Sequence, residues 1–234
     1  RPHAEHLGGH PAVDVLVDGL ALGGVGLGPA GIEEVVELGV VPAPEVDHLG
    51  AGSDVLTVTY NVVSNGVWLT NLAADTVSGG YKGLFDGYGS NDVWFSGIER
   101  FSFTDASGGN DNIRTGDGAD TLNGGAGDDR LDGKGGADVI DGGLGKDHWG
   151  GHFATAGSAF KIDLNGVSTL LTSGSVKNIE AMALTTGSGN DTITGLEGQD
   201  SLRGEGGNDL LDGGGGLDLI DGGGDFDTLL YTSD

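Results

Sequence analysis

The sequence predicts an all-β fold made of tight turns and short parallel strands that stack in coils. Aspartate recurs every nine residues in two runs, one from Asp111 to Asp147 and the other from Asp191 to Asp227. Glycine lies two residues before nine of these ten aspartates, and an aliphatic or aromatic residue lies two residues after each of them. Such a unit indicates a six-residue turn, which needs glycine, followed by a three-residue strand whose middle side chain faces a core.

Two nine-residue units make one coil, so turns that are 18 residues apart in the sequence stack at one strand spacing, roughly 4.8 Å. Carboxylates stacked at that separation repel each other unless a cation lies between them. The turns offer only oxygen ligands, from carboxylate and carbonyl groups, which favours calcium over zinc or copper. A flexible cage with several ligands favours calcium over magnesium as well. The predicted metal ligands are Asp111, Asp120, Asp129, Asp138, Asp147, Asp191, Asp200, Asp209, Asp218 and Asp227, together with Gly109, Gly118, Gly127, Gly136, Gly145, Gly189, Gly198, Gly207 and Gly216.

The stacking also predicts how many calcium ions bind. Aspartates that are 18 residues apart form three neighbouring pairs in each run, which gives about six sites. Six divalent ions would reduce the formal charge from −26 to −14. We expect each site to have the weak affinity of extracellular calcium modules, with a dissociation constant of about 10⁻⁴–10⁻³ M.

The units resemble the RTX, or haemolysin-type, calcium-binding nonapeptide GGxGxDxUx. Residues 124–132 (GGAGDDRLD) and 213–221 (GGGGLDLID) match every fixed position. The resemblance covers residues 106–150 and 186–230 and implies a right-handed parallel β-roll, the RTX solenoid, in two blocks with flanking capping strands. It also implies an exported bacterial protein that is handled by the type I secretion machinery and is secreted, extracellular or bound to the cell surface.

Composition divides the chain into five segments. Residues 1–50 contain four of the six histidines and four of the five prolines, and only residues 30–38 (AGIEEVVEL) favour a short helix. The predicted segments are a linker or poorly ordered N-terminal segment (1–50), a β-strand capping region (51–105), the first RTX roll (106–150), a β-rich connecting segment (151–185) and the second RTX roll (186–234).

Charge and composition exclude several classes of protein. With 36 acidic and 10 basic residues the chain lacks a basic stripe, so we expect no nucleic acid partner. No apolar run approaches the roughly 18 residues of a membrane span. Cysteine is absent, which excludes disulfides and thiolate metal sites. A chain with 50 glycines and this charge is also typical of disorder, so we expect bound calcium to decide whether it folds.

For other acidic residues and histidines, a purely structural role is an alternative to a functional one. Asp92 is either a ligand in a degenerate extra unit (87–95) or part of an ordinary turn. Glu99 and Glu180 recur at equivalent places in a duplication of about 80 residues, which favours a capping or turn role. His148 and His152 are separated by glycines that disfavour the helix such a metal pair would need.

The sequence is compatible with three functions. The sequence contains neither an HExxH nor a GxSxG motif, so no catalytic residue is assigned and we do not expect this chain to be an enzyme. The first interpretation is a calcium-binding repeat module that folds on Ca²⁺ binding after export, as part of a larger secreted RTX protein. The alternatives are the C-terminal part of a secreted enzyme (a protease, a lipase or a polysaccharide-modifying enzyme) and the repeat array of a surface adhesin. No protein or carbohydrate partner is identified.

Overall fold

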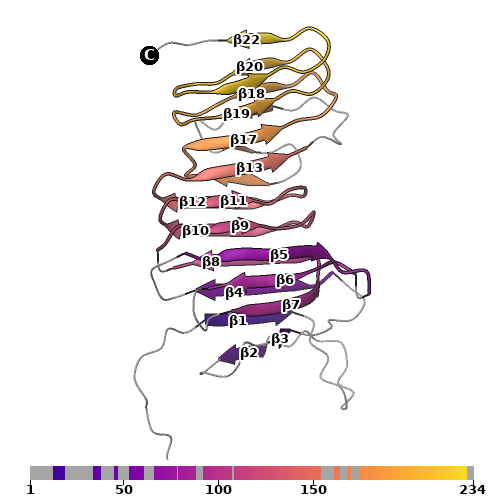
Figure 1. The fold of residues 1–234 in the computed structure, drawn as a ribbon, viewed down its shortest axis with the longest axis vertical. Coiled ribbons are helices and arrows are strands. Elements are labelled where there is room, and N and C mark those ends of the chain that lie inside the picture. Colours follow the sequence, from indigo (N-terminus) through magenta and orange to yellow (C-terminus); the bar gives the residue numbers. More distant parts are fainter. Residues whose placement is uncertain are drawn as a thin grey trace, which may run out of the picture.

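The computed structural model describes residues 13–18, 34–37, 45–46, 53–60, 66–77, 79–87, 92–106, 108–153, 161–163, 168–169 and 174–230. These residues form 22 strands and no helix, which confirms the all-β prediction. The strands lie one above another along the long axis, from the indigo N-terminal end to the yellow C-terminal end (Figure 1). Within the described ranges, no helix is long and apolar enough to cross a membrane.

The strands belong to three sheets. The eight-stranded sheet, here sheet A, has the order β15 (Ser168–Thr169), β16 (Ser175–Lys177), β12 (Val139–Leu144), β10 (Thr121–Ala126), β8 (Arg100–Asp105), β4 (Val55–Tyr60), β1 (Val13–Asp18) and β2 (Glu34–Glu37). The ten-stranded sheet, sheet B, has the order β21 (Leu219–Asp221), β19 (Ser201–Arg203), β17 (Ala181–Thr185), β13 (His148–His152), β11 (Arg130–Asp132), β9 (Asn112–Arg114), β5 (Trp68–Ala74), β6 (Tyr81–Asp86), β7 (Val93–Ile98) and β3 (Glu45–Val46). Sheet C contains β14 (Lys161–Asp163), β18 (Thr192–Thr194), β20 (Leu210–Asp212) and β22 (Thr228–Leu230).

Successive repeat strands alternate between two walls of a parallel β-roll. In the first block β9, β11 and β13 belong to sheet B, whereas β10 and β12 belong to sheet A. In the second block β19 and β21 belong to sheet B, whereas β18, β20 and β22 belong to sheet C. Leu131 pairs in parallel with Ile113 on one side and with Trp149 on the other, so each coil contains 18 residues, as the sequence predicts.

The core is one continuous cluster that runs through both blocks. The residue two after each repeat aspartate points inward, and those from Ile113 to Trp149 are at most 1% exposed. Burial of this row ends with the stack, because Ile220 is only partly buried and Leu229 is 55% exposed. Apolar burial at this position holds the two walls together, with about 1.5–3 kcal/mol for each fully buried side chain.

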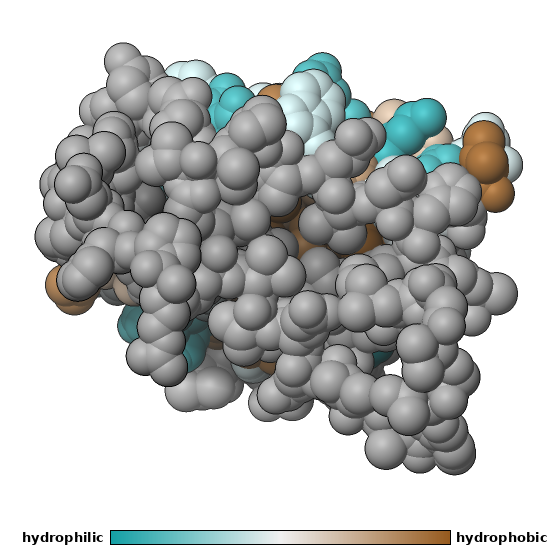
Figure 2. Space-filling view, turned by 90° about the horizontal axis from the view of Figure 1, so that it is seen from below, coloured by the Kyte–Doolittle hydropathy of each residue, from teal (hydrophilic) through white to brown (hydrophobic). Residues whose placement is uncertain are grey.

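Antiparallel strands and aromatic side chains precede the first repeat. Strands β5, β6 and β7 form an antiparallel meander at the start of sheet B. Phe85, which lies on β6, stacks on Phe103 with 5.8 Å between ring centroids and also packs against Phe95 and Phe101. Asp92 lies next to β7, which pairs antiparallel with β6, and most of the turn before it lies outside the described residues. From the lower end of Figure 1, hydrophilic (teal) and hydrophobic (brown) residues both reach the surface (Figure 2).

The predicted short helix at residues 30–38 is wrong. Glu34–Glu37 instead form strand β2, which pairs antiparallel with β1 and extends sheet A. Val35 and Val36 are β-branched, and such residues prefer strands to helices when a partner edge is present. Strand β1 in turn pairs with β4. Most of residues 1–50, where we predict a linker, lie outside the described residues.

One sheet joins the two blocks. Strand β17 belongs to the segment between them, where no nonapeptide occurs, yet it pairs in parallel with β13 below and with β19 above. The register aligns Trp149 with Met182, and Leu184 with Leu202. The aspartates that precede sheet B strands therefore lie along one edge through both blocks.

Candidate metal centre

The repeat aspartates are buried in the turns that enter the strands. Asp111 immediately precedes β9, and the later members occupy the same place in each described turn. Eight of the ten are at most 4% exposed, and the exceptions are Asp218 and Asp227 at the end of the stack. Isolated buried carboxylates are costly, so each needs a hydrogen-bond donor or a cation.

In nine of the ten repeat aspartates, one carboxylate oxygen accepts a hydrogen bond from a backbone N–H of a neighbouring turn or strand. The N–H of Asp111 donates to Oδ1 of Asp129, 18 residues later, at 2.8 Å. The same bond joins five more pairs at 2.8–3.1 Å: Asp120 to Asp138, Asp129 to Asp147, Asp191 to Asp209, Asp200 to Asp218 and Asp209 to Asp227. These bonds show the same three stacked pairs in each block that the sequence predicts.

The second oxygen lies beside the space that the absent side chain of the first glycine of its turn leaves, here called the hollow. Oδ2 of Asp129 is buried and has no hydrogen-bond partner, and the same holds for Oδ2 of Asp111, Asp147 and Asp209. A Cβ at Gly124 would collide with Oδ2 of Asp129 and would lie 2.8 Å from the carbonyl oxygen of Gly142 in the next coil. Gly204 has the same surroundings, from the carboxylate of Asp209 and the carbonyl of Gly222.

Glycine lets neighbouring turns approach closely. Gly127, two residues before Asp129, has a φ of 136°, and a Cβ there would collide with the carbonyl oxygen of Gly109. The same collision recurs in every later turn of this geometry, at Gly136, Gly145, Gly207 and Gly216. The carbonyls that they would strike belong to Gly118, Gly127, Gly189 and Gly198 respectively. All nine predicted glycines therefore lie at contacts between stacked turns.

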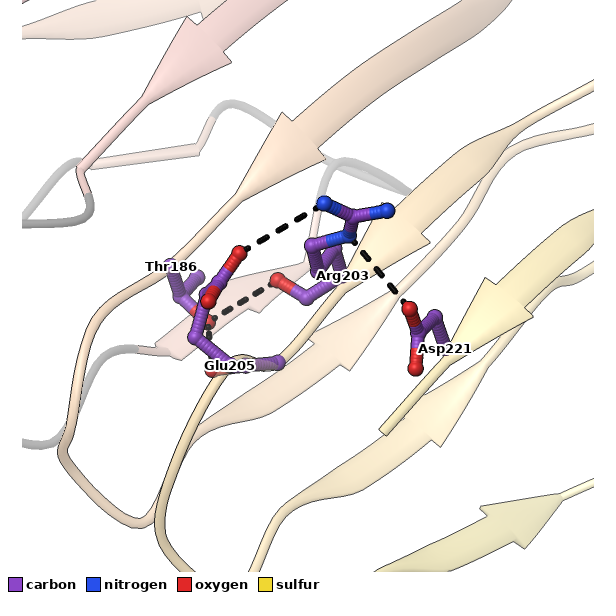
Figure 3. Close-up of polar contacts among 5 residues, drawn as sticks. Thr186, Arg203, Glu205 and Asp221 are labelled. Carbon is purple, nitrogen blue, oxygen red and sulfur yellow. Dashed lines mark hydrogen bonds and ion pairs between the residues drawn. The ribbon is translucent and has the colours of Figure 1, made fainter. Parts of the chain in front are cut away.

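Several turns depart from this arrangement. Where Leu196 replaces the second glycine, its N–H donates to Oδ2 of Asp200 at 2.6 Å, so this carboxylate has donors on both oxygens. Thr186 takes the place of a first glycine, and its hydroxyl donates to the carbonyls of Arg203 and Gly204 (Figure 3). In these turns, hydrogen-bond donors of the protein thus bind oxygen atoms that are available in the regular turns.

The donor set fits a hard divalent cation. Within the described part of the chain no three His, Asp or Glu side chains converge on one point. Each regular hollow instead combines an aspartate Oδ2 with a carbonyl oxygen from the next coil. Oxygen-only surroundings of this kind suit calcium and offer nothing to metals that prefer nitrogen or sulfur.

Comparison with known families agrees with this chemistry. The family model for the RTX calcium-binding nonapeptide repeat matches four times, at residues 105–140, 114–148, 185–220 and 194–229. The two blocks are RTX calcium-binding repeats. They form a structural calcium-binding module with a β-roll fold and not a catalytic one. No curated protein matches this chain.

Two glutamates outside the RTX nonapeptides continue the hydrogen-bond ladder. Oε2 of Glu99 accepts from the N–H of Asp54 at 2.8 Å, and Oε2 of Glu180 accepts from the N–H of Asp147 at 2.7 Å. These equivalent bonds agree with the recurrence of both glutamates in the duplicated sequence. Their equivalence to the RTX aspartates is not visible in the motif, because their spacing to the repeats departs from nine.

Burial changes the protonation of the RTX aspartates. Desolvation raises the pKa of Asp111 to about 8, of Asp138 to about 7 and of Asp129 to about 6, against backbone hydrogen bonds that lower it. A carboxyl group whose folded-state pKa is raised stabilises the fold below its unfolded value, near 3.8. That stabilisation disappears as the pH rises through the folded pKa.

We therefore expect the metal-free chain to lose stability between about pH 4 and pH 8. In EDTA, circular dichroism is expected to show β-structure with a measurable thermal unfolding midpoint at pH 5 and a disordered chain at pH 8. Saturating calcium is expected to reverse this order, because calcium binds the deprotonated carboxylates. Equal midpoints in EDTA at both pH values would contradict the buried, uncompensated state of these groups.

Proposed function

We propose that this chain is a calcium-dependent folding module of a larger secreted protein. The observation that carries the proposal is the row of buried aspartate Oδ2 atoms without hydrogen-bond partners, which face carbonyl oxygens across stacked turns. The ten repeat aspartates and their preceding glycines would supply the ligands of about six ions, one for each hydrogen-bonded pair of turns. Calcium bound there would supply the positive charge that these buried carboxylates lack.

The pairs are not equivalent in this proposal. In the pairs Asp129–Asp147 and Asp209–Asp227, the second and fourth positions of both turns have positive φ values. The other four pairs each include a turn that departs from this geometry. We expect the two regular pairs to bind calcium most tightly, because their hollows need the least rearrangement.

Weak affinity would make folding depend on location. A dissociation constant near 10⁻⁴–10⁻³ M leaves the sites empty at submicromolar calcium and fills them at millimolar calcium. The module would thus stay unfolded before export and fold outside the cell. The prevalence of RTX repeats in secreted proteins supports this order of events, and type I secretion machinery is the transporter that the family implies.

A pair of neighbouring substitutions tests the ligand assignment. Asp129→Asn keeps the Oδ1 acceptor for the N–H of Asp111 but removes charge from the hollow. We expect isothermal titration to show fewer bound calcium ions and a folding midpoint shifted to at least tenfold more calcium, since even an outer-shell partner of a metal contributes roughly 10- to 100-fold. Asp128→Asn changes the net charge equally at an exposed position and is expected to behave as wild type. Identical titrations for the two variants would refute the assignment.

A further inference from the structure

The turn at Asp147 is followed by a coil that contains no nonapeptide. The last unit of the first block ends at Gly150, and the next repeat aspartate is Asp191. The sheet B edge nevertheless continues, because the N–H of Asp147 donates to Glu180 and the N–H of Met182 donates to Oδ1 of Asp200, both at 2.7 Å. Glu180 thus accepts the bond that an aspartate accepts in a regular coil, whereas the donor of the next bond on this edge is Met182, two residues later.

The hollow beside Gly142 has the same composition as the hollows inside the repeats. A Cβ at Gly142 would lie 2.7 Å from Oδ2 of Asp147 and would collide with the carbonyl oxygen of Asn178. In the regular turn beside Gly124, the corresponding carbonyl comes from Gly142. Asn178 presents its carbonyl from a backbone with a φ of 53°, and its side-chain amide donates to Asp141 at 2.7 Å.

The burial of Asp147 is an independent indication that this hollow takes a ligand. Asp147 is 1% exposed, and its Oδ2 has no hydrogen-bond partner. Glu180, by contrast, is exposed.

We propose that Asp147, Asn178 and Glu180 form a further calcium site that joins the first repeat block to the connecting coil that leads into β17. Oδ2 of Asp147, the Asn178 carbonyl and the Glu180 carboxylate are its ligands. This site rests on the proposed calcium function of the repeats, but it lies where no nonapeptide follows. With it, the series of sites on the sheet B edge extends from the first block into the connecting coil, which β17 pairs with the second block.

Native mass spectrometry of the whole chain in calcium, with and without Glu180→Gln, tests this site. Glutamine retains an acceptor for the N–H of Asp147 but removes the charge, so the variant is expected to bind one calcium ion fewer than wild type. Glu197→Gln makes the same change at an exposed side chain in a repeat turn and is expected to leave the number unchanged. Equal numbers in all three proteins would overturn the proposal.

A mutation-free measurement covers the case in which Glu180→Gln does not fold. Crystals of the wild-type chain grown in calcium would locate each ion by its anomalous scattering. A peak between the carboxylates of Asp147 and Glu180 supports the site. Peaks between repeat turns but none here would overturn this inference and leave the proposed function intact. Absence of a peak at every turn would overturn the proposed function itself.

Discussion

Gly127→Ala is expected to destabilise the calcium-bound fold by roughly 2–6 kcal/mol. About 1–3 kcal/mol comes from placing a side chain at a φ of 136°. A further 1–3 kcal/mol or so comes from the collision of its Cβ with the Gly109 carbonyl, which is packed in the stack below. Because domains of this kind have total stabilities of about 5–15 kcal/mol, the loss is expected to unfold much of the first block.

Gly135→Ala provides the matched control in the next turn of the same block. Gly135 has no left-handed backbone, and the nearest atom to its added Cβ is Oδ1 of Asp117 at 3.5 Å, an ordinary contact. We expect its stability to be unchanged or raised by less than about 1 kcal/mol, because alanine restricts the unfolded chain. Urea unfolding in saturating calcium measures both variants. Equal midpoints would show that close approach of the turns is not what requires glycine.

The sequence was sufficient to predict the repeating part of the structure. A period of nine, with glycine before and an apolar residue after each aspartate, specified the coil of 18 residues and the inward row from Ile113 to Trp149. This succeeded because the same local requirements recur in every turn. The pairing of Asp111 with Asp129 and its equivalents followed directly from that period.

The connection between the blocks could not be predicted in this way. The continuity of sheet B through β17, and the place of Glu180 on its edge, depend on backbone register across a segment with no motif. A sequence also does not show where backbone carbonyl groups lie, so the carbonyl oxygen of Asn178 could not be identified as a candidate ligand. Residues 34–37 show a related limit. Glutamates near a short apolar run favour a helix locally, whereas pairing with β1 selects a strand.

Removal of calcium is the second change from which we expect a large effect. At 10 mM calcium and a dissociation constant of about 1 mM, each site stabilises the fold by about 1.4 kcal/mol. Six such sites give about 8 kcal/mol, which is comparable to the whole stability of a typical domain. Without calcium this contribution disappears, and a formal charge of −26 remains with buried carboxylates that repel one another.

Far-UV circular dichroism of the whole chain at pH 8, first in EDTA and then during titration with calcium, tests the central claim most directly. We predict the spectrum of a disordered chain in EDTA and a cooperative change to a β-sheet spectrum as calcium reaches the millimolar range. Magnesium at equal concentration is expected to produce no such change, because it demands a smaller, near-octahedral site. A β-sheet spectrum in EDTA with the same thermal midpoint as in calcium would contradict the account.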